Sequence, residues 1–206
     1  MPTGYDSFYG WYRGAAIDAN LVTEFTMPAR DVELLGYFIP SQHTQYTVKH
    51  YLQNANDDGY TEDTSRQETL QGETLQTVTA YPLNTITGMG YIYNPGASTP
   101  TGTIAEDGSL VLELYYDRLT YNVTYQFIDA PAGKAGTEPT DATAYRHGAE
   151  VLFDINPQAE VGYTFHGWHI QDADITTVPG GFEMPNRNVV IYGIWTANSD
   201  THYTVK

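Results

Sequence analysis

Three segments of the chain alternate between apolar and polar side chains with a period of two residues. They are residues 46–52, 110–116 and 121–127. This period is typical of a β-strand with one buried face. The side chains predicted to share a face within each strand are Tyr46, Val48, His50 and Leu52; Leu110, Leu112, Leu114 and Tyr116; and Tyr121, Val123, Tyr125 and Phe127.

Shorter apolar segments complete the predicted β-structure. Val151, Phe153 and Ile155 fall at alternate positions, and residues 189–195 form a nearly all-apolar final strand. Asp-Gly pairs at 58–59 and 107–108 tolerate positive φ and predict hairpin turns. No window of a dozen residues carries a helical stripe, so we expect an all-β to α+β fold with little helix.

The chain also repeats itself with a constant offset. An aromatic-Gly-Trp block ending at Trp11 returns at Trp168, 157 positions later. A Phe-x-Met-Pro block that contains Met27 returns around Met184, and the block Tyr-Thr-Val-Lys at 46–49 returns at 203–206, both with the same offset of 157. Three blocks in one register indicate a tandem array of modules.

This register predicts four parts. Residues 1–40 are expected to be the later half of a module that also recurs at 120–197. A different module is expected at 44–119, and residues 198–206 are expected to begin its next copy. The boundary between the two whole modules is predicted near residues 118–121, where one alternating strand ends and another begins.

A half-module exposes apolar side chains that its missing strands would cover. We therefore expect low local order in residues 1–40. Seven side chains are expected to be unusually exposed, or to take cover from the module at 44–119: Phe8, Trp11, Phe25, Met27, Leu34, Leu35 and Phe38. In the whole module, by contrast, Trp168, Phe182 and Met184 are predicted to share a core, with a carbohydrate-stacking surface as the alternative.

Composition supports the β prediction and narrows the choice of partner. The chain holds 18 Tyr, 7 Phe and 3 Trp, and aromatic side chains suit a pleated, half-buried surface. Nine Lys and Arg against 25 Asp and Glu leave a net charge of −16, which disfavours nucleic acid and anionic membranes as partners. The absence of Cys excludes disulfides and thiolate metal sites.

Residues 165–168 (Phe-His-Gly-Trp), 182–189 (Phe-Glu-Met-Pro-Asn-Arg-Asn-Val) and the strand ending at Trp195 resemble the Listeria–Bacteroides repeat, or internalin B-repeat. The first copy departs from this pattern, with Phe38 where Trp195 stands. The module at 44–119 resembles MucBP-like repeats in residues 46–51, Gly59-Tyr60, Gln71-Gly72-Glu73, Gly102-Thr103-Ile104 and Tyr115-Tyr116.

The resemblance implies small β-grasp-like folds arrayed on bacterial surface proteins. It makes 1–40 the truncated C-terminal half of a B-repeat-like module, 44–119 a MucBP-like module and 120–197 a B-repeat-like module. No signal peptide, transmembrane run or sorting motif is present in the sequence, so an exported protein would contain this chain as a fragment of something longer. The expected location is the bacterial cell surface or cell wall.

Two candidate metal sites are considered and not adopted. His166 and His169 lie three residues apart, a spacing that suits a metal on a helix, but the segment is predicted to be strand and turn. An oxygen-rich hairpin suggests Ca²⁺, yet its spacing does not match a Ca²⁺-binding loop, so an exposed turn is favoured. Its members are Asn54, Asn56, Asp57, Asp58 and Asp63.

Covalent and catalytic chemistry is likewise not predicted. The only lysines are Lys49, Lys134 and Lys206; a Lys–Asn cross-link is conceivable, but a solvated Lys49 is favoured. The chain lacks a Gly-x-Ser-x-Gly motif, and the sequon at Asn122 falls within a predicted strand. We predict no catalytic, cofactor-binding or metal-binding residues, and no enzyme activity.

Two functions remain from the sequence. The first is a non-catalytic stalk or spacer of a surface adhesin, whose partners are the neighbouring repeats. The alternative is a module that binds mucin glycans or host surface proteins, with avidity from copy number. An exposed Tyr or Trp platform on residues 44–119 would favour binding, and buried aromatics would favour the spacer.

Overall fold

The computed structural model describes residues 1–13, 21–153 and 159–199. Within these ranges the chain is mostly β-strand, with one four-residue helix, α1 (Asn84–Thr87), and one 3₁₀ turn, η1 (Thr64–Arg66). The prediction of an all-β to α+β fold with little helix is confirmed. No helix of the described residues is long and apolar enough to cross a membrane.

The chain divides into two compact units. The first comprises Met1–Leu52, Thr61–Leu83 and Tyr93–Tyr116, and the second comprises Gln53–Tyr60, Asn84–Ile92 and Asp117–Lys206. Two short segments from before residue 117 therefore belong to the unit that holds the C-terminal residues. Strands β9 (Val111–Arg118) and β10 (Thr120–Ile128) lie in different sheets, with only Leu119 between them.

The first unit begins with an antiparallel hairpin of β1 (Tyr5–Arg13) and β2 (Leu34–Pro40), which forms a two-stranded sheet of its own. Its apolar side chains are exposed as the sequence predicts: Phe8 is 38% exposed, Trp11 50%, Phe25 40%, Met27 65% and Leu35 48%. Leu34 and Phe38 are half-buried, so the expectation of unusual exposure is wrong for these two. The Phe38 ring packs against Tyr5 and Phe8 of β1, which cover part of it.

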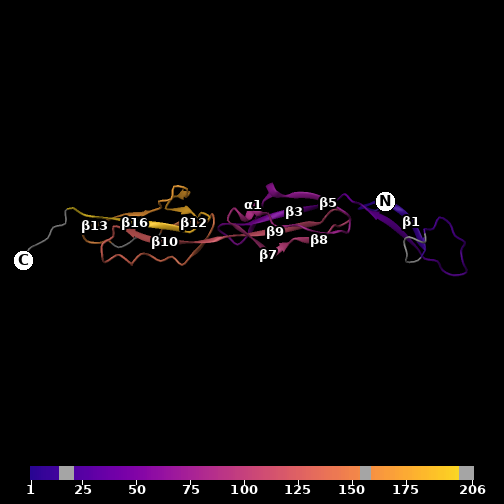
Figure 1. Ribbon diagram of the computed structural model, residues 1–206, viewed down its shortest axis with the longest axis horizontal. Helices are drawn as coiled ribbons and strands as arrows, with labels where there is room; N and C mark the ends of the chain where they lie inside the picture. Colours follow the sequence, from indigo (N-terminus) through magenta and orange to yellow (C-terminus); the bar gives the residue numbers. More distant parts are fainter. Residues whose placement is uncertain (14–20, 154–158, 200–206) are drawn as a thin grey trace, which may run out of the picture. The chain divides into compact units, whose positions relative to one another are not determined.

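A larger sheet follows the hairpin (Figure 1). Its strand order is β4-β3-β9-β7, β5 pairs with β3, and β3 runs parallel to β9. A separate ladder joins β6 and β8. The bounds are β3 Thr44–Gln53, β4 Tyr60–Glu62, β5 Glu68–Gly72, β6 Thr77–Thr79, β7 Tyr91–Thr99 and β8 Thr101–Thr103.

The side chains that the sequence predicts to share one face of each strand form the core of this sheet. Val48 and His50 on β3 and Leu112, Leu114 and Tyr116 on β9 are all buried. His50 is 1% exposed, and its Nδ1 lies 2.9 Å from the Tyr116 hydroxyl. This hydrogen bond satisfies two polar groups that would otherwise be costly to bury.

The second unit contains a four-stranded sheet of order β11-β10-β16-β13 and a three-stranded sheet of order β12-β15-β14. Strands β10 and β16 run parallel in the middle of the larger sheet (Figure 1). The bounds are β11 Ala144–Arg146, β12 Glu150–Leu152, β13 Tyr163–His169, β14 Thr177–Val178, β15 Gly181–Glu183 and β16 Val189–Ala197.

Two of the three predicted core residues of this unit are fully buried. Phe182 is 0% and Met184 1% exposed, in a cluster with Val123, Val151 and Ile191. Trp168 only packs against the edge of that cluster, because β13 is the outer strand of its sheet. The fully buried indole belongs instead to Trp195, at 1% exposure on the central strand β16. Ile155 lies outside the described residues.

Candidate functional site

The two histidines considered as metal ligands lie on strand β13, as the sequence predicts. Nε2 of His166 is 2.9 Å from the Thr196 hydroxyl, and Nε2 of His169 is 3.1 Å from the His166 carbonyl oxygen. Each ring thus has a protein partner. In the described parts of the chain, no three His, Cys, Asp or Glu side chains are arranged to hold a metal ion.

The oxygen-rich hairpin does not gather its carboxylates around one point. Asp57 Oδ1 accepts hydrogen bonds from Asn54 Nδ2 and the Gly59 N–H, both at 2.7 Å. These bonds, with the nearby charge of Arg146, lower the pKa of the Asp57 carboxyl. Asp63 instead caps η1 through Ser65 and pairs with Arg66. The arrangement is that of an ordered turn.

The lysines considered for cross-linking are found in ion pairs. Lys49 Nζ lies 3.0 Å from Glu62, and Lys134 Nζ lies 3.5 Å from Glu160. Lys206 lies outside the described residues. The sequon residue Asn122 lies within β10, where its backbone N–H donates to Asn188 Oδ1 at 2.9 Å.

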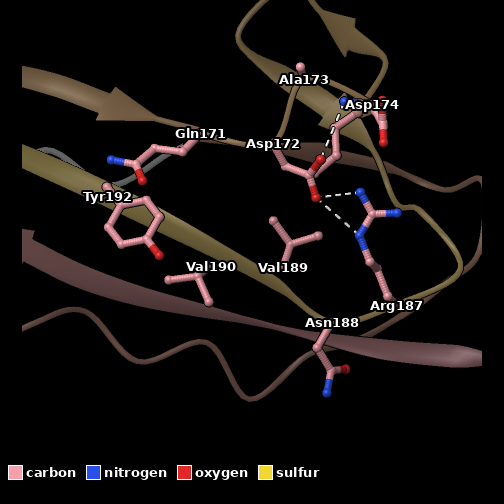
Figure 2. A pocket seen from close by; sticks show the side chains of 10 residues that line it. Gln171, Asp172, Ala173, Asp174, Arg187, Asn188, Val189, Val190 and Tyr192 are labelled. Atoms are coloured by element: carbon pink, nitrogen blue, oxygen red, sulfur yellow. Dashed lines mark hydrogen bonds and ion pairs between the residues drawn. The ribbon is translucent and has the colours of Figure 1, made fainter.

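A hollow of about 640 Å³ opens on the second unit beside β16 (Figure 2). Its floor holds the buried Ile175 and Val189, and its rim holds Asp172, Asp174 and Arg187. Arg187 Nε donates to Asp172 Oδ2 at 3.1 Å, which lowers the pKa of that carboxyl. Of the two acids in the lining, Asp172 is thus paired with a permanently charged arginine.

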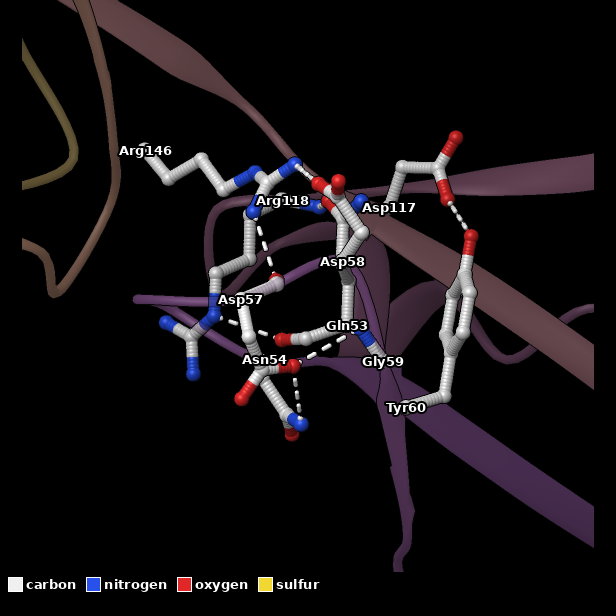
Figure 3. Close-up of polar contacts among 9 residues, drawn as sticks. All are labelled: Gln53, Asn54, Asp57, Asp58, Gly59, Tyr60, Asp117, Arg118 and Arg146. Carbon is white, nitrogen blue, oxygen red and sulfur yellow. Dashed lines mark hydrogen bonds and ion pairs between the residues drawn. The ribbon is translucent and has the colours of Figure 1, made fainter.

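The densest polar contacts of the second unit surround Arg118, at the end of β9 (Figure 3). Its Nε donates to the Gln53 carbonyl oxygen and its Nη1 to the His147 carbonyl oxygen, each at 2.7 Å. Its backbone N–H donates to Gln53 Oε1 at 3.0 Å. The guanidinium also lies over the ring of Tyr91, 4.9 Å from the centroid, a cation–π geometry.

Two further contacts join the 53–60 segment to residues after 116 (Figure 3). Arg146 on β11 donates from Nη1 to the Asp57 carbonyl oxygen at 2.6 Å and from Nη2 to Asp58 Oδ1 at 2.5 Å. The Tyr60 hydroxyl donates to Asp117. We call these residues, together with Gln53, Tyr91, Arg118 and His147, the Arg118 cluster.

The 84–92 segment enters the same cluster through backbone contacts. Gly90, at φ +88°, accepts from the Leu119 N–H at 2.9 Å, and the Leu119 carbonyl accepts from the His147 N–H at 2.9 Å. A Cβ at Gly90 would lie 2.8 Å from His147 Nδ1, so both the conformation and the space require glycine. Burial and the charge of Arg118 lower the pKa of His147, which keeps its ring neutral beside the guanidinium.

The Arg118 cluster is a structural contact rather than a chemical site. Arginine suits it because the planar guanidinium offers several fixed donors and stacks on an aromatic ring. The sequence analysis missed this cluster. The available signal was the scarcity of cations: Arg66, Arg118, Arg146 and Arg187 are four of only nine Lys and Arg, and each is engaged by acids or carbonyls.

The aromatic side chains of residues 44–119 do not form an exposed platform in the described structure. Tyr116 is 0% and Tyr91 7% exposed, while Tyr81 alone among the tyrosines of this segment is strongly exposed, at 77%. Tyr51 and Tyr115 stack on each other at 4.7 Å and are half-buried. Exposed rings are found instead on the N-terminal hairpin.

Comparison with known proteins identifies one part of the chain. Residues 127–199 match the family of the divergent InlB B-repeat domain, which confirms the B-repeat resemblance there. No curated protein matches the chain. Among solved structures, the chain is similar to Streptococcal High Identity Repeats in Tandem (SHIRT) domains 3-4 from a cell surface protein, at 13% identity and a TM-score of 0.30, covering 73% of this chain and 96% of that one. The MucBP resemblance of 44–119 stays a prediction, and residues 127–199 are similar to an InlB B-repeat domain.

Proposed function

We propose that this chain is a non-catalytic spacer segment of a bacterial cell-surface adhesin, in which successive modules join end to end. The offset of 157 residues and the B-repeat match at 127–199 support a tandem array. On this proposal its partners are the neighbouring repeats, and its location is the cell surface. The observation that carries the proposal is the repeat register, in which three blocks of sequence share the offset of 157 residues.

A spacer needs modules that stay folded without a ligand. Within the second unit, Arg118 and Arg146 donate hydrogen bonds that hold the 53–60 segment against residues after 116. Charge-assisted hydrogen bonds are about twice as strong as neutral ones, so the cluster stabilises this unit.

The placement of aromatics supports the spacer over the glycan-binding alternative. Sugar-binding surfaces present aromatic faces to solvent, whereas the tyrosines of 44–119 are mostly buried or half-buried. Tyr81 alone is too small a platform to favour binding of mucin glycans or host proteins, and we therefore do not propose that function.

The test is small-angle X-ray scattering on the chain and on a tandem of two copies joined at the offset of 157 residues. The modules of a repeat array contact only their neighbours, so we expect the maximum dimension to grow in proportion to chain length. A tandem whose maximum dimension hardly exceeds that of the single chain would refute the spacer.

A further inference from the structure

The N-terminal hairpin repeats the pairing of β13 with β16 at four residue pairs and differs at the end of the ladder, where Pro40 pairs with Tyr5 but Ala197 pairs with Tyr163. Trp11 pairs with Gly36 as Trp168 pairs with Gly193, and each member is displaced by 157 positions. Both pairs of strands are bulged just before the Trp, close to Gly10 and Gly167. The other equivalent pairs are Ser7–Ile39 with Thr164–Thr196, Phe8–Phe38 with Phe165–Trp195, and Tyr12–Leu35 with His169–Tyr192.

The aromatic rings on these strands also repeat their geometry. Phe8 and Trp11 lie edge to face with centroids 5.4 Å apart, as Phe165 and Trp168 do at 5.5 Å. Phe8 and Phe38 are tilted by 53° at 5.0 Å. Phe165 and Trp195 are tilted by 51° at 5.0 Å. The hairpin therefore presents the same aromatic face as the B-repeat.

In the second unit, side chains of strand β10 cover the aromatic face of β13 and β16. Strand β10 runs parallel to β16, with Phe127 opposite Gly193. The Phe127 ring stacks on Trp168 at 5.6 Å and meets Trp195 edge to face at 5.9 Å. Tyr125 adds an edge-to-face contact to Trp168 at 4.9 Å. Backbone pairing and ring packing thus come from the same strand.

Among the described residues, no aromatic ring is found on Gly36 in the place that Phe127 takes on Gly193. A Cβ at Gly193 would lie 2.7 Å from Trp168, 2.9 Å from Phe127 and 2.9 Å from Phe165. A Cβ at Gly36 would lie 3.0 Å from the Trp11 ring and 3.2 Å from the Phe8 ring, and its three nearest atoms all belong to these two rings. Within the described residues β2 pairs with β1 alone, so its other edge offers backbone donors and acceptors.

We propose that this hairpin binds an extended peptide segment with the chemistry of β10, as a parallel strand along residues 32–37, which include the first half of β2. The offset sets the register: residues 123–128 of β10 pair with 189–194, which correspond to 32–37. An aromatic side chain in place of Phe127 then lies over Gly36, between Phe8 and Trp11. Strand addition supplies backbone hydrogen bonds, and the aromatic site supplies specificity.

The occupant we propose is a segment of this chemistry other than the β10 of a second copy. In each copy β10 is already paired on both sides, with β11 and with β16. A second copy would have to break its own B-repeat to donate the strand. The charge of −16 on each copy further opposes their association. This inference does not depend on the spacer proposal.

The test uses the full chain labelled with ¹⁵N and a synthetic peptide with the sequence of residues 120–129. We expect a saturable shift of the Trp11 indole N–H and slower exchange of backbone amides in residues 34–37. A peptide with Phe127→Ala should bind about tenfold or more weakly, since it lacks the ring but leaves the chain unchanged. Trp11→Ala in the chain should weaken binding similarly, while Trp168→Phe should leave it unchanged.

Three results would overturn the proposal. One is no shift of Trp11 at millimolar peptide. Another is equal binding of both peptides, which would show non-specific adhesion to an aromatic face. The third is a shift of Trp11 that depends on chain concentration without peptide, which would identify a second copy as the occupant.

Discussion

At the scale of single residues, the buried imidazole of His50 makes stability depend on pH. Burial lowers its pKa; the charges of Glu68 and Asp63 oppose this shift, and that of Arg66 adds to it. The unfolded chain binds a proton near pH 6.5, while the folded chain holds the ring neutral. Its contribution to stability is therefore present above pH 6.5 and is lost as pH falls through the lowered folded pKa.

We expect the melting temperature of the first unit to fall between pH 7 and pH 5. The fall should be smaller in His50→Gln, whatever that variant costs at neutral pH. His43→Gln is the control, since His43 is exposed, and it should keep the slope of the unchanged chain. Thermal melts at several pH values measure this, and identical slopes in all three proteins would contradict it.

The internal repeat also supplies matched single-residue variants. Phe182 is 0% exposed, while its equivalent Phe25 is 40% exposed. Phe182→Ala leaves a cavity and should cost about 3–5 kcal/mol in the free energy of unfolding. Phe25→Ala should cost less than about 1 kcal/mol, because its ring is already partly exposed to water and its loss leaves no enclosed cavity. Urea unfolding followed by resolved amide signals of each unit distinguishes them; equal costs would contradict the difference in burial.

At the scale of elements, glycine allows β13 and β16 to pair beneath the aromatic rings. A Cβ at Gly193 would approach three rings within 2.9 Å. Gly193→Ala should therefore destabilise the second unit by about 1–3 kcal/mol. Gly133→Ala is the control, because no atom lies within 4 Å of the new Cβ. Denaturant midpoints test this, and a neutral Gly193→Ala would mean that the rings shift aside without cost.

At the scale of the whole molecule, the net charge of −16 governs how copies meet. Like charges repel over roughly 30 Å in 0.01 M salt and over only about 8 Å at 0.15 M. Static light scattering should give a positive second virial coefficient at low salt that decreases as salt is added. Attraction at low salt would show that the exposed hairpin overcomes charge repulsion and joins copies of the chain.

Much of the fold and little of the polar contact network could be predicted. Alternation placed Leu112, Leu114 and Tyr116 on one buried face, because a strand turns every second side chain to the same side. It did not distinguish Trp168 from Trp195, since both lie in apolar strands. Their difference in burial comes from strand order: β13 is an edge and β16 is central.

The sequence by itself determined the β class, the strand faces, the repeat register and the exposure of Phe8, Trp11, Phe25, Met27 and Leu35. These follow from local periodicity and from self-similarity, which need no knowledge of distant contacts. The tertiary structure alone decided that β10 runs parallel to β16, that Arg118 meets Gln53 and His147, and that His50 is buried against Tyr116. Such contacts join residues up to 66 positions apart, and no local pattern encodes which distant carbonyl or hydroxyl a side chain will reach.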